Sequence, residues 1–170
     1  MIRLAKKGDI QEIMAIVEVI IDEMMEVENY QWDQTYPRKE DFLRDIENET
    51  LYVYESGHIG GFICIDFSRP NEYKDLKWSS NDKAPVIHRM AVSSKFRGQG
   101  VAVDLMKHAE NLCKDMGLAY IHTDTYSSNK AMNNLLIKMG YRLVGSINMM
   151  GKPLLFNCYE RKVDYEKSSN

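Results

Sequence analysis

The residues with the clearest chemical meaning form one glycine-rich segment, Arg97-Gly98-Gln99-Gly100-Val101-Ala102. It lies between a strand-like run, 86–92, and an amphipathic helical pattern that begins at Val101. Glycine lets the backbone approach a ligand closely and leaves amide N–H groups uncovered. The first turn of the following helix adds unpaired N–H donors and the positive end of the helix dipole. Together these features predict an anion cradle that suits a pyrophosphate.

Two kinds of side chain near this segment could move protons. His88 lies in the strand-like run, two residues before Met90, and alternation along a strand predicts that both point to one face. Histidine titrates near neutral pH, which suits a general base. The competing interpretation is a partly buried core histidine bonded to a backbone carbonyl. Asp66 and Asp124 are expected near strand ends, where each could act as a base, orient a neighbour or only end a strand.

Length and composition narrow the class of protein. A chain of 170 residues fits one domain that can bury a core of its own. Its hydrophobic and charged fractions, 44% and 28%, are typical of a soluble globular protein, and no run reaches transmembrane length. The formal net charge of −3 argues against non-specific nucleic-acid binding, which favours a basic surface. We therefore expect no nucleic-acid or membrane partner.

The cysteines indicate a reducing compartment and no metal site. Cys64, Cys113 and Cys158 are odd in number, lie far apart and have no metal-ligand spacing. The simplest interpretation is three buried, reduced thiols in a cytoplasmic protein. The N-terminus also lacks the long apolar stretch of a signal peptide.

Hydrophobic periodicity predicts the elements that would hold these residues in position. Four helices are expected, over 9–24, 37–46, 101–116 and 131–139. Seven strands are expected, over 2–4, 50–55, 59–67, 86–92, 119–125, 142–148 and 154–160. Residues 68–85 are expected to form a loop anchored by Trp78. Three consecutive strands before the glycine-rich segment exclude a doubly wound nucleotide fold and favour a mixed sheet with helices on both faces.

Local signals mark where the first two helices begin. Asp9 is predicted to be the N-cap of the first helix, with Glu12 completing a capping box. Pro37 is predicted in the first turn of the second helix, where its missing N–H has no helical partner to lose.

The chain resembles the GNAT-superfamily N-acetyltransferases. The family pattern Gln/Arg-x-x-Gly-x-Gly/Ala is matched by Arg97, Gly100 and Ala102. The segment 88–92, His-Arg-Met-Ala-Val, resembles the family's fourth strand, and 129–141 resembles the helix that ends in Gly-Phe or Gly-Tyr. The order of the expected elements agrees with the family over nearly the whole chain.

The resemblance implies an α+β (mixed α/β) fold in one domain, residues 1–163, followed by a polar C-terminal tail, 164–170. The domain would contain a GNAT-like central mixed, mostly antiparallel β-sheet of about seven strands, flanked by about four helices. Its fourth and fifth strands would splay apart to admit a ligand. A homodimer is a common arrangement of such folds.

The resemblance also implies acetyl-CoA as the co-substrate, without a metal. The amides of the glycine-rich segment would hold its pyrophosphate, and the backbone of the fourth strand would pair with its pantetheine arm. Asn129 matches the position that often bonds that arm. The implied contact residues are Met90, Ala91, Val92, Arg97, Gly98, Gln99, Gly100, Val101, Ala102 and Asn129.

The implied reaction is acetyl transfer to a primary amine of a small-molecule or peptide acceptor by direct attack. The attacking amine must be neutral, and a base that removes its proton is commonly worth about 10²–10⁴-fold. His88 is the candidate base, and Asp124 is a second candidate. A backbone N–H of Met90 or Val92 would stabilise the oxyanion that forms.

The sequence departs from the family pattern at Leu136, where many members carry a tyrosine that protonates the leaving thiolate. Leucine cannot donate a proton, so the candidate donors are Tyr126, Tyr159 or solvent. A thiol with a reference pKa of about 8.5 is a tolerable leaving group even without an acid. The alternative function is a catalytically weak or inactive acyl-CoA-binding sensor module. A P-loop nucleotide enzyme is disfavoured, because the turn lacks a Gly-Lys-Ser/Thr ending.

The acceptor pocket in this family is usually built from the loop between the first two helices, which here contains Tyr30, Trp32 and Asp33. Aromatic rings could bind the aliphatic or cationic part of an amine, with Asp33 pairing with its charge. The alternative is that Trp32 only seals the helix ends against the sheet.

Overall fold

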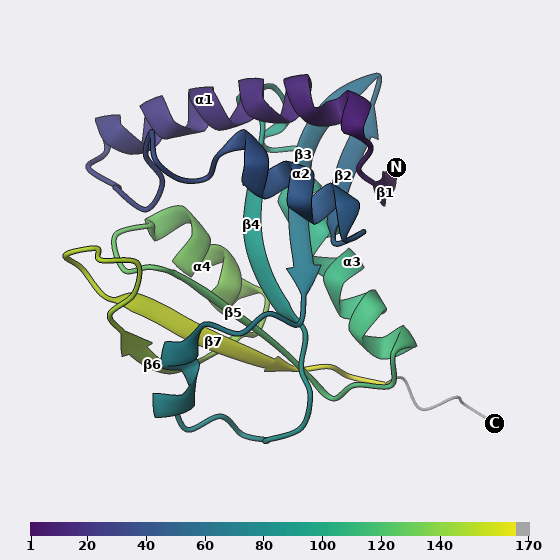
Figure 1. Ribbon diagram of the computed structural model, residues 1–170. Helices are drawn as coiled ribbons and strands as arrows, with labels where there is room; N and C mark the ends of the chain where they lie inside the picture. The colour runs from purple at the N-terminus through teal and green to yellow at the C-terminus, as the bar shows by residue number, and fades with distance from the viewer. Residues whose placement is uncertain (166–170) are drawn as a thin grey trace.

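The computed structural model describes residues 1–165, which form a seven-stranded sheet with helices on both faces (Figure 1). The strands are β1 (Ile2–Leu4), β2 (Leu51–Ser56), β3 (His58–Asp66), β4 (Val86–Val92), β5 (Tyr120–Tyr126), β6 (Arg142–Ile147) and β7 (Phe156–Lys162). The helices are α1 (Ile10–Glu26), α2 (Lys39–Glu47), α3 (Val101–Asp115) and α4 (Lys130–Lys138). The expected α+β class and element order are confirmed. Residues 166–170 of the predicted polar tail lie outside the described residues.

The order of the strands determines where the glycine-rich segment lies relative to the sheet. The order is β1-β2-β3-β4-β5-β7-β6, and every neighbouring pair is antiparallel except β4 and β5. Parallel neighbours need a crossover, and the chain makes this crossover through α3. The glycine-rich segment is the first part of the crossover, so it lies beyond the C-terminal end of β4.

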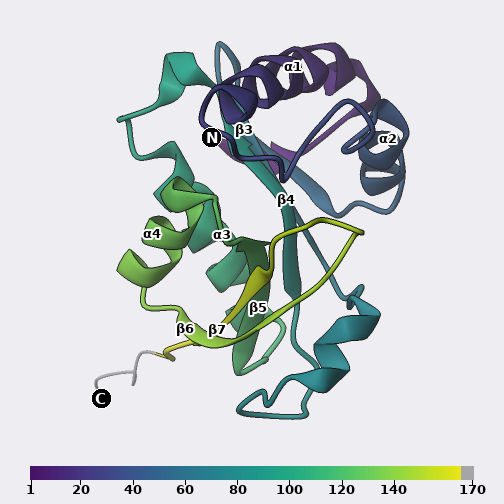
Figure 2. The ribbon, with the colours of Figure 1, turned by 90° about the vertical axis from the view of Figure 1, so that its left-hand side faces the viewer.

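Each face of the sheet is covered by two helices that bury an apolar stripe. On one face, α1 and α2 bury Ile13, Val17 and Phe42 against β2 and β3. On the other face, α3 and α4 bury Leu105 and Leu136 in a second core. Figure 2 shows the sheet between these two pairs of helices. Among residues 1–165, no helix has both the length and the apolar character needed to cross a membrane.

The predicted capping box of the first helix is wrong. Asp9 is the N-cap residue of α1, as expected, but its carboxylate accepts the N–H of Lys6 at 2.7 Å and pairs with Arg3 at 2.8 Å instead of bonding to the first turn of the helix. Glu12 accepts the N–H of Ile59, at the start of β3, at 2.9 Å. Both side chains therefore bond to groups outside the helix, and neither caps the helix N-terminus.

The second helix begins later than the sequence suggested. α2 starts at Lys39, so Pro37 lies in the preceding connection instead of the first helical turn. Its N-terminal cap is formed around Arg38, whose backbone N–H is accepted by Asp41 at 2.8 Å. The buried face agrees with the prediction, because Phe42 and Ile46 both face the core.

The connection 68–85 is held to the sheet by Trp78, as expected, and it contains a short 3₁₀ helix, η2 (Asn71–Asp75). The Trp78 indole donates to the carbonyl of Tyr73 at 2.9 Å. Its ring stacks on His122 of β5, with centroids 4.0 Å apart and an angle of 16° between the planes. The stack on His122 therefore holds this connection beside β5, and the hydrogen bond fixes the Trp78 indole within the connection.

His122 is buried between a cation and an anion. Its Nδ1 lies 2.9 Å from a guanidinium nitrogen of Arg69, and its Nε2 lies 3.8 Å from the carboxylate of Glu160. Burial and the nearby Arg69 charge lower the pKa of His122 to about 4, and Glu160 opposes this shift only in part. The ring is therefore neutral in the folded protein at neutral pH.

This environment predicts acid destabilisation. An unfolded histidine takes up a proton near pH 6.5, whereas His122 does so only near pH 4, so the unfolded state binds more protons between these values. The free energy of unfolding should therefore fall as the pH drops through this window, by about 2 kcal/mol from this residue between pH 7 and pH 5. We expect His122→Phe to have a smaller difference between urea unfolding at pH 7 and at pH 5 than the wild type. An equal pH dependence in the two proteins would contradict the lowered pKa of His122.

Candidate functional site

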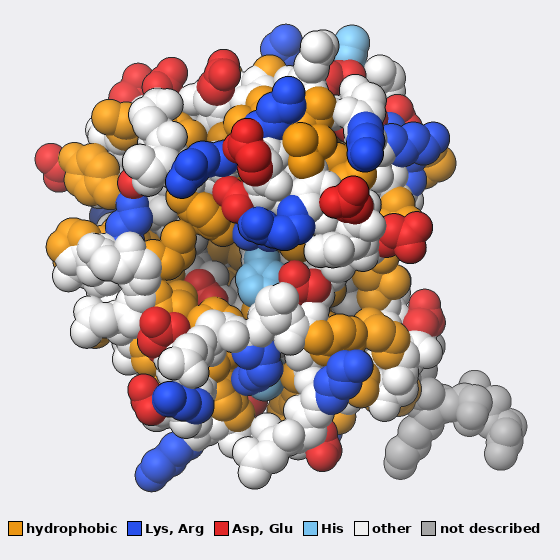
Figure 3. All heavy atoms as spheres, viewed as in Figure 1, with side chains coloured by type: hydrophobic (Ala, Val, Ile, Leu, Met, Phe, Trp, Pro, Cys, Tyr) orange, Lys and Arg blue, Asp and Glu red, His pale blue; other side chains and the backbone are white. Residues whose placement is uncertain are grey.

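β4 and β5 separate after two paired positions. Val86 pairs with His122 and Ile87 with Thr123, and the ladder ends there although both strands continue. β5 stays paired with β7 and β4 with β3, so the two halves of the sheet diverge. A cavity of about 1180 Å³ lies in the gap. Figure 3 shows the face that carries α1 and α2, which is hollowed near its centre beside a histidine. The expected splay of the fourth and fifth strands is confirmed.

The cavity is lined by several segments that lie far apart in the chain, between Ile20 and Phe156. β4 and β5 form two walls, and the end of α1 with the α1–α2 connection forms a third. The starts of α3 and α4 and the β6–β7 connection complete the lining. The lining residues include Asn29, Gln31, Trp32, His88, Met90, Ala91, Val92, Arg97, Ala102, Asp124, Thr125, Ser128 and Asn129.

A bulge in β4 decides which way its side chains point. The β3–β4 register shifts between Ile63 and Ile65, so β4 has one extra residue opposite them. Ile63 and Ile65 pack in the α3 core, and alternation then directs Asp66 to the face of α1 and α2. His88 is bonded to Asp66, whereas Met90 packs in the α3 core. The prediction that His88 and Met90 share a face is therefore wrong, because the bulge interrupts the alternation.

His88 and Asp66 form a hydrogen-bonded pair at the cavity. Nε2 of His88 lies 2.7 Å from Oδ1 of Asp66, and each side chain is about one-fifth exposed, 18% and 20%. Burial alone would raise the pKa of Asp66, but the hydrogen bond and charge of His88 and the N–H of Ser68 bring it below its ordinary value. A neutral imidazole that donates Nε2–H to this carboxylate keeps a lone pair on Nδ1. The pair can therefore accept a proton at Nδ1.

Asp124 presents its own carboxyl group to the cavity from β5, whereas Asp66 does not line the cavity and is joined to it through His88. Its Oδ2 accepts the hydroxyl of Tyr73 at 2.5 Å. Burial raises the pKa of Asp124, and the Tyr73 hydrogen bond and the charge of His88 oppose this only in part. The site thus contains two carboxyl groups whose pKa values are shifted in opposite directions, since that of Asp66 is lowered.

The two tyrosines expected as proton donors lie outside the cavity lining. The hydroxyl of Tyr126 accepts the N–H of Leu154 at 2.9 Å inside a buried cluster. The hydroxyl of Tyr159 donates to Asn133 of α4 at 2.6 Å. Leu136 is fully buried in the α3–α4 core. These positions do not support either tyrosine as a donor to a group in the cavity.

The glycine-rich segment has the backbone conformation that only glycine adopts readily. Gly98 and Gly100 have φ angles of 74° and 80°, and apart from their own chain neighbours no heavy atom of residues 1–165 lies within 4 Å of where a Cβ would stand at either position. α3 begins at Val101, and within residues 1–165 no side chain caps its N-terminus. Its first N–H groups are therefore available to a ligand.

The side chains of this segment divide between the cavity and its outer rim. Arg97 and Ala102 line the cavity, as do Met90, Ala91 and Val92 of β4, whereas the four residues between Arg97 and Ala102 do not. Arg97 pairs with Glu23 of α1. The Gln99 side chain donates to a backbone carbonyl of η3 (Ser94–Phe96).

The structure separates the three predicted acceptor residues. Trp32 is buried, lines the cavity and lies parallel to the ring of Phe62, with centroids 6.3 Å apart. Tyr30 is 48% exposed and does not line the cavity. Asp33 is paired with Lys152 of the β6–β7 connection at 2.6 Å. Hydrogen bonds from Lys152 and Thr35 lower the pKa of Asp33 to about 2. In this structure the partner of Asp33 is Lys152 of the same chain.

Arg89 is a structural residue of the site that sequence reasoning missed. Two of its guanidinium nitrogens donate to the two carboxylate oxygens of Asp45 in α2, each at 2.7 Å, and a third donates to the hydroxyl of Tyr36 at 2.9 Å. This bidentate pair ties the bulged part of β4 to α2. No local pattern could have found it, because its members are 44 residues apart in the chain.

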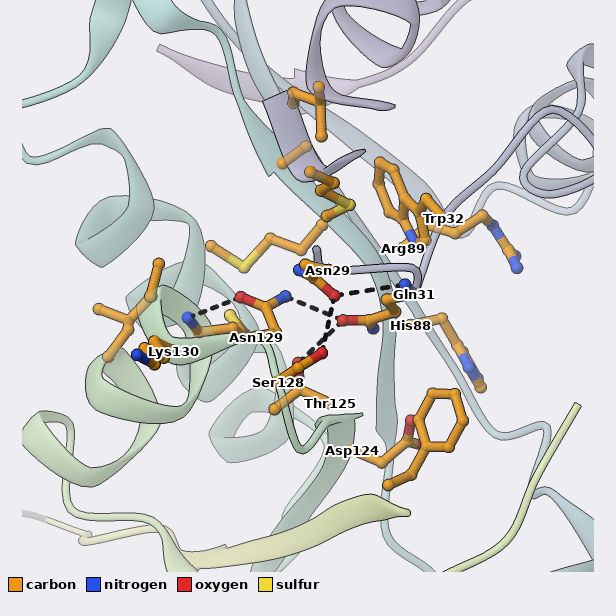
Figure 4. A pocket seen from close by; sticks show the side chains of 18 of the residues that line it. Asn29, Gln31, Trp32, His88, Arg89, Asp124, Thr125, Ser128, Asn129 and Lys130 are labelled. Atoms are coloured by element: carbon orange, nitrogen blue, oxygen red, sulfur yellow. Dashed lines mark hydrogen bonds between the residues drawn. The ribbon is translucent and has the colours of Figure 1, made fainter. Parts of the chain in front are cut away.

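Gln31 and Asn29 were also missed, and they join the α1–α2 connection to the β5–α4 turn (Figure 4). The side-chain oxygen of Gln31 accepts Nδ2–H of Asn129 at 2.8 Å. Asn129 also caps α4, since its Oδ1 accepts the N–H of Met132 at 3.1 Å. The side-chain oxygen of Asn29 accepts the hydroxyl of Ser128 at 3.4 Å. The residue expected to bond a pantetheine arm is therefore held here by two partners of its own chain.

Comparison with known proteins identifies the family. The model of the Acetyltransferase (GNAT) family matches residues 14–141. An uncharacterized N-acetyltransferase of Bacillus subtilis (strain 168), YesJ, is 23% identical over 108 residues, which are 62% of this chain and only 60% of that protein. A putative acetyltransferase from Staphylococcus aureus Mu50 has a similar structure, with a TM-score of 0.76 and 32% identity, covering 96% of this chain and 99% of that one. The putative acetyltransferase yncA from Salmonella typhimurium, solved with its cofactor acetyl-CoA, has a TM-score of 0.70 and 15% identity, covering 100% of this chain and 97% of that one. Since the family match spans most of the sequence, this chain belongs to the GNAT family of acetyltransferases.

Proposed function

We propose that this protein transfers the acetyl group of acetyl-CoA to a primary amine of a small-molecule or peptide acceptor by direct nucleophilic attack. The observation that carries the proposal is that one cavity joins two features of different chemistry. Arg97 and Ala102 mark the start of α3, where an anion can be held, and His88, bonded to Asp66, can accept a proton. Membership of an acetyltransferase family supports transfer of an acetyl group between these two ends.

The residues of this chain fit the co-substrate. Positive φ angles at Gly98 and Gly100, open space at both, and an uncapped helix start suit a diphosphate. The cavity of about 1180 Å³ lies slightly above the usual range of about 300–1,000 Å³ for ligand sites, which suits an elongated molecule. yncA contains acetyl-CoA, but at 15% identity its likeness concerns the fold, so the support comes from the residues named here. When bound, acetyl-CoA would supply an activated acyl group as a thioester.

The proposal assigns the contacts along the arm of the co-substrate to β4 and α4. Met90, Ala91 and Val92 line the cavity at the point where β4 has no partner on its β5 side, so we propose that their backbone groups contact the arm. Asn129 lines the opposite wall. A backbone N–H of Met90 or Val92 is proposed to stabilise the oxygen that gains negative charge during transfer.

The ammonium group of the acceptor must lose a proton before it can attack, and this step needs a side chain that acts as a base. Only roughly one lysine-like amine in a few thousand is neutral at pH 7. We assign His88 as the base and Asp66 as the positioning residue that directs the lone pair of its ring. Asp124 shares the cavity and could hold the cationic acceptor while the proton is transferred.

A second candidate function is an acyl-CoA-binding sensor without useful turnover. The observation that favours it is the absence of the expected acid: Leu136 is buried, and neither Tyr126 nor Tyr159 belongs to the cavity lining. A thiolate can leave without an acid, because a thiol's reference pKa of about 8.5 is close to neutral. The enzyme therefore remains the leading proposal.

A thiol-release assay separates the two functions. Purified protein with acetyl-CoA and a panel of diamines, amino acids and short peptides should release free thiol in an acceptor-dependent way. Calorimetry on the same preparation should give saturable binding of CoA. Saturable binding with no turnover on any amine would favour the sensor, and no binding by folded protein would contradict both functions.

Gly100→Ala tests the anion cradle, with Gly57→Ala as a matched control. Both glycines have positive φ, 80° and 75°, and open space around the Cβ position, so each substitution should cost about 1–2 kcal/mol of stability. Only Gly100 precedes α3, whereas Gly57 lies in the β2–β3 turn. We expect Gly100→Ala alone to weaken CoA binding by about tenfold, comparable to losing one charge-assisted hydrogen bond. Equal CoA affinities for the two variants would argue against the cradle.

His88→Gln tests the base. The substitution keeps a polar side chain but removes the titrating ring, so kcat should fall by about 10²-fold or more. Asp66→Asn keeps the ring and removes the charge that orients it, and should have a smaller effect. The measurement is the dependence of kcat on pH, with circular dichroism to check folding. If His88→Gln retains the wild-type pH–rate profile, His88 is not the base.

A further inference from the structure

Three donors beside the gap converge on one carbonyl oxygen, that of the Gln31 side chain. Nδ2 of Asn129 lies 2.8 Å from this oxygen, Oγ1 of Thr125 lies 3.2 Å away and the backbone N of Tyr126 lies 3.4 Å away. The donors come from the end of β5 and the start of α4, whereas Gln31 comes from the α1–α2 connection. Figure 4 shows Gln31 reaching from that connection toward Asn129 and Thr125.

The N–H of Tyr126 is directed away from β7, toward the side on which β4 would lie. In a regular parallel sheet such an N–H would be donated to the neighbouring strand. β4 has already diverged from β5 at this level, so the N–H needs another carbonyl. Gln31 supplies that carbonyl through a side-chain amide. The end of β5 thus forms a binding site for an amide oxygen, and a residue of this chain occupies it.

The α1–α2 connection, which carries Gln31, also forms the side of the cavity where we expect the acceptor to bind. We call this side the acceptor wall. Trp32 is the next residue; it is buried and lines the cavity. Asn29, which is 4% exposed, accepts both the N–H of Gln31 at 3.3 Å and the hydroxyl of Ser128 at 3.4 Å. The position of this wall therefore depends on the contacts that Gln31 and Asn29 make with the β5–α4 turn.

We propose that Gln31 is a positioning residue that holds the amide site at the end of β5 until an amide of the pantetheine arm replaces it. This inference rests on the proposed function. An arm that enters the gap presents amide groups of the same chemistry as the Gln31 side chain. Its carbonyl takes the three donors, and Gln31 is released with the connection that carries Trp32. The connection that carries Trp32 then reaches its final position only after the arm has entered the gap.

Two substitutions at Gln31 should change CoA affinity in opposite directions. Gln31→Ala removes the competing oxygen, so we expect CoA to bind about tenfold more tightly, which corresponds to about 1.4 kcal/mol. Gln31→Glu retains the oxygen and adds a charge that holds the same donors more strongly, so CoA should bind more weakly than to the wild type. A merely structural role would instead weaken CoA binding in both variants.

The chain offers a matched control and a local reporter. Gln34 lies in the same connection and is exposed, so Gln34→Ala should leave CoA affinity unchanged. The sequence has two tryptophans, Trp32 and Trp78, so a Trp78→Phe background isolates the fluorescence of Trp32. CoA should change Trp32 emission in the wild-type background and much less in Gln31→Ala, where the connection is no longer held.

The test of the proposal for Gln31 combines two measurements, both made without an acceptor. They are calorimetry of CoA binding and the fluorescence of Trp32. Tighter binding by Gln31→Ala, weaker binding by Gln31→Glu and a CoA-dependent Trp32 signal would support the proposal. Wild-type protein that binds CoA, with no gain in affinity for Gln31→Ala, would overturn this inference and leave the proposed function standing. Wild-type protein that does not bind CoA would overturn both. If Gln31→Ala does not fold, unchanged or tighter CoA binding by Gln31→Glu overturns the inference.

Discussion

The early separation of β4 and β5 is the constraint on which the rest of the site depends. β4 pairs with β5 at only two of its positions, Val86 and Ile87. Beyond them, β4 is paired with β3 alone and β5 with β7 alone. The cavity exists because this parallel ladder is not continued. The bulge at the same point of β4 turns His88 toward Asp66, and the Arg89–Asp45 pair anchors the bulged backbone to α2.

Opening a sheet leaves polar groups that must be satisfied, and the described chain meets this need with side chains from distant segments. Gln31 accepts the N–H at the end of β5, and Lys152 neutralises Asp33 where the two cavity-lining connections meet. Of these two contacts, that of Gln31 satisfies the N–H of the buried Tyr126, which would cost about 1–3 kcal/mol if it had no partner. They bear on function as well, because a ligand in the gap must satisfy or replace the same groups.

Much of the fold could be predicted, and so could the backbone torsions of the glycine-rich segment. The apolar repeat of α1, from Ile13 through Ile20, and the positive-φ glycines before α3 depend on neighbours a few residues away. The acceptor end was predicted less well. The loop was recognised, but the contact of Asp33 with Lys152, 119 residues later in the chain, has no local sequence signal. Asp9 and Glu12 likewise match a capping box, yet Arg3 and Ile59 compete successfully for them.

The sequence by itself determined which elements form, their order and where an anion could be bound, because helix periodicity, strand alternation and glycine torsions are local properties. Only the tertiary structure decided which face His88 occupies, because a single extra residue in a strand reverses every alternation beyond it. It also brought the side-chain oxygen of Gln31 to the donors at the end of β5. That contact joins residues about a hundred positions apart, and the chain must close into a sheet before they can meet.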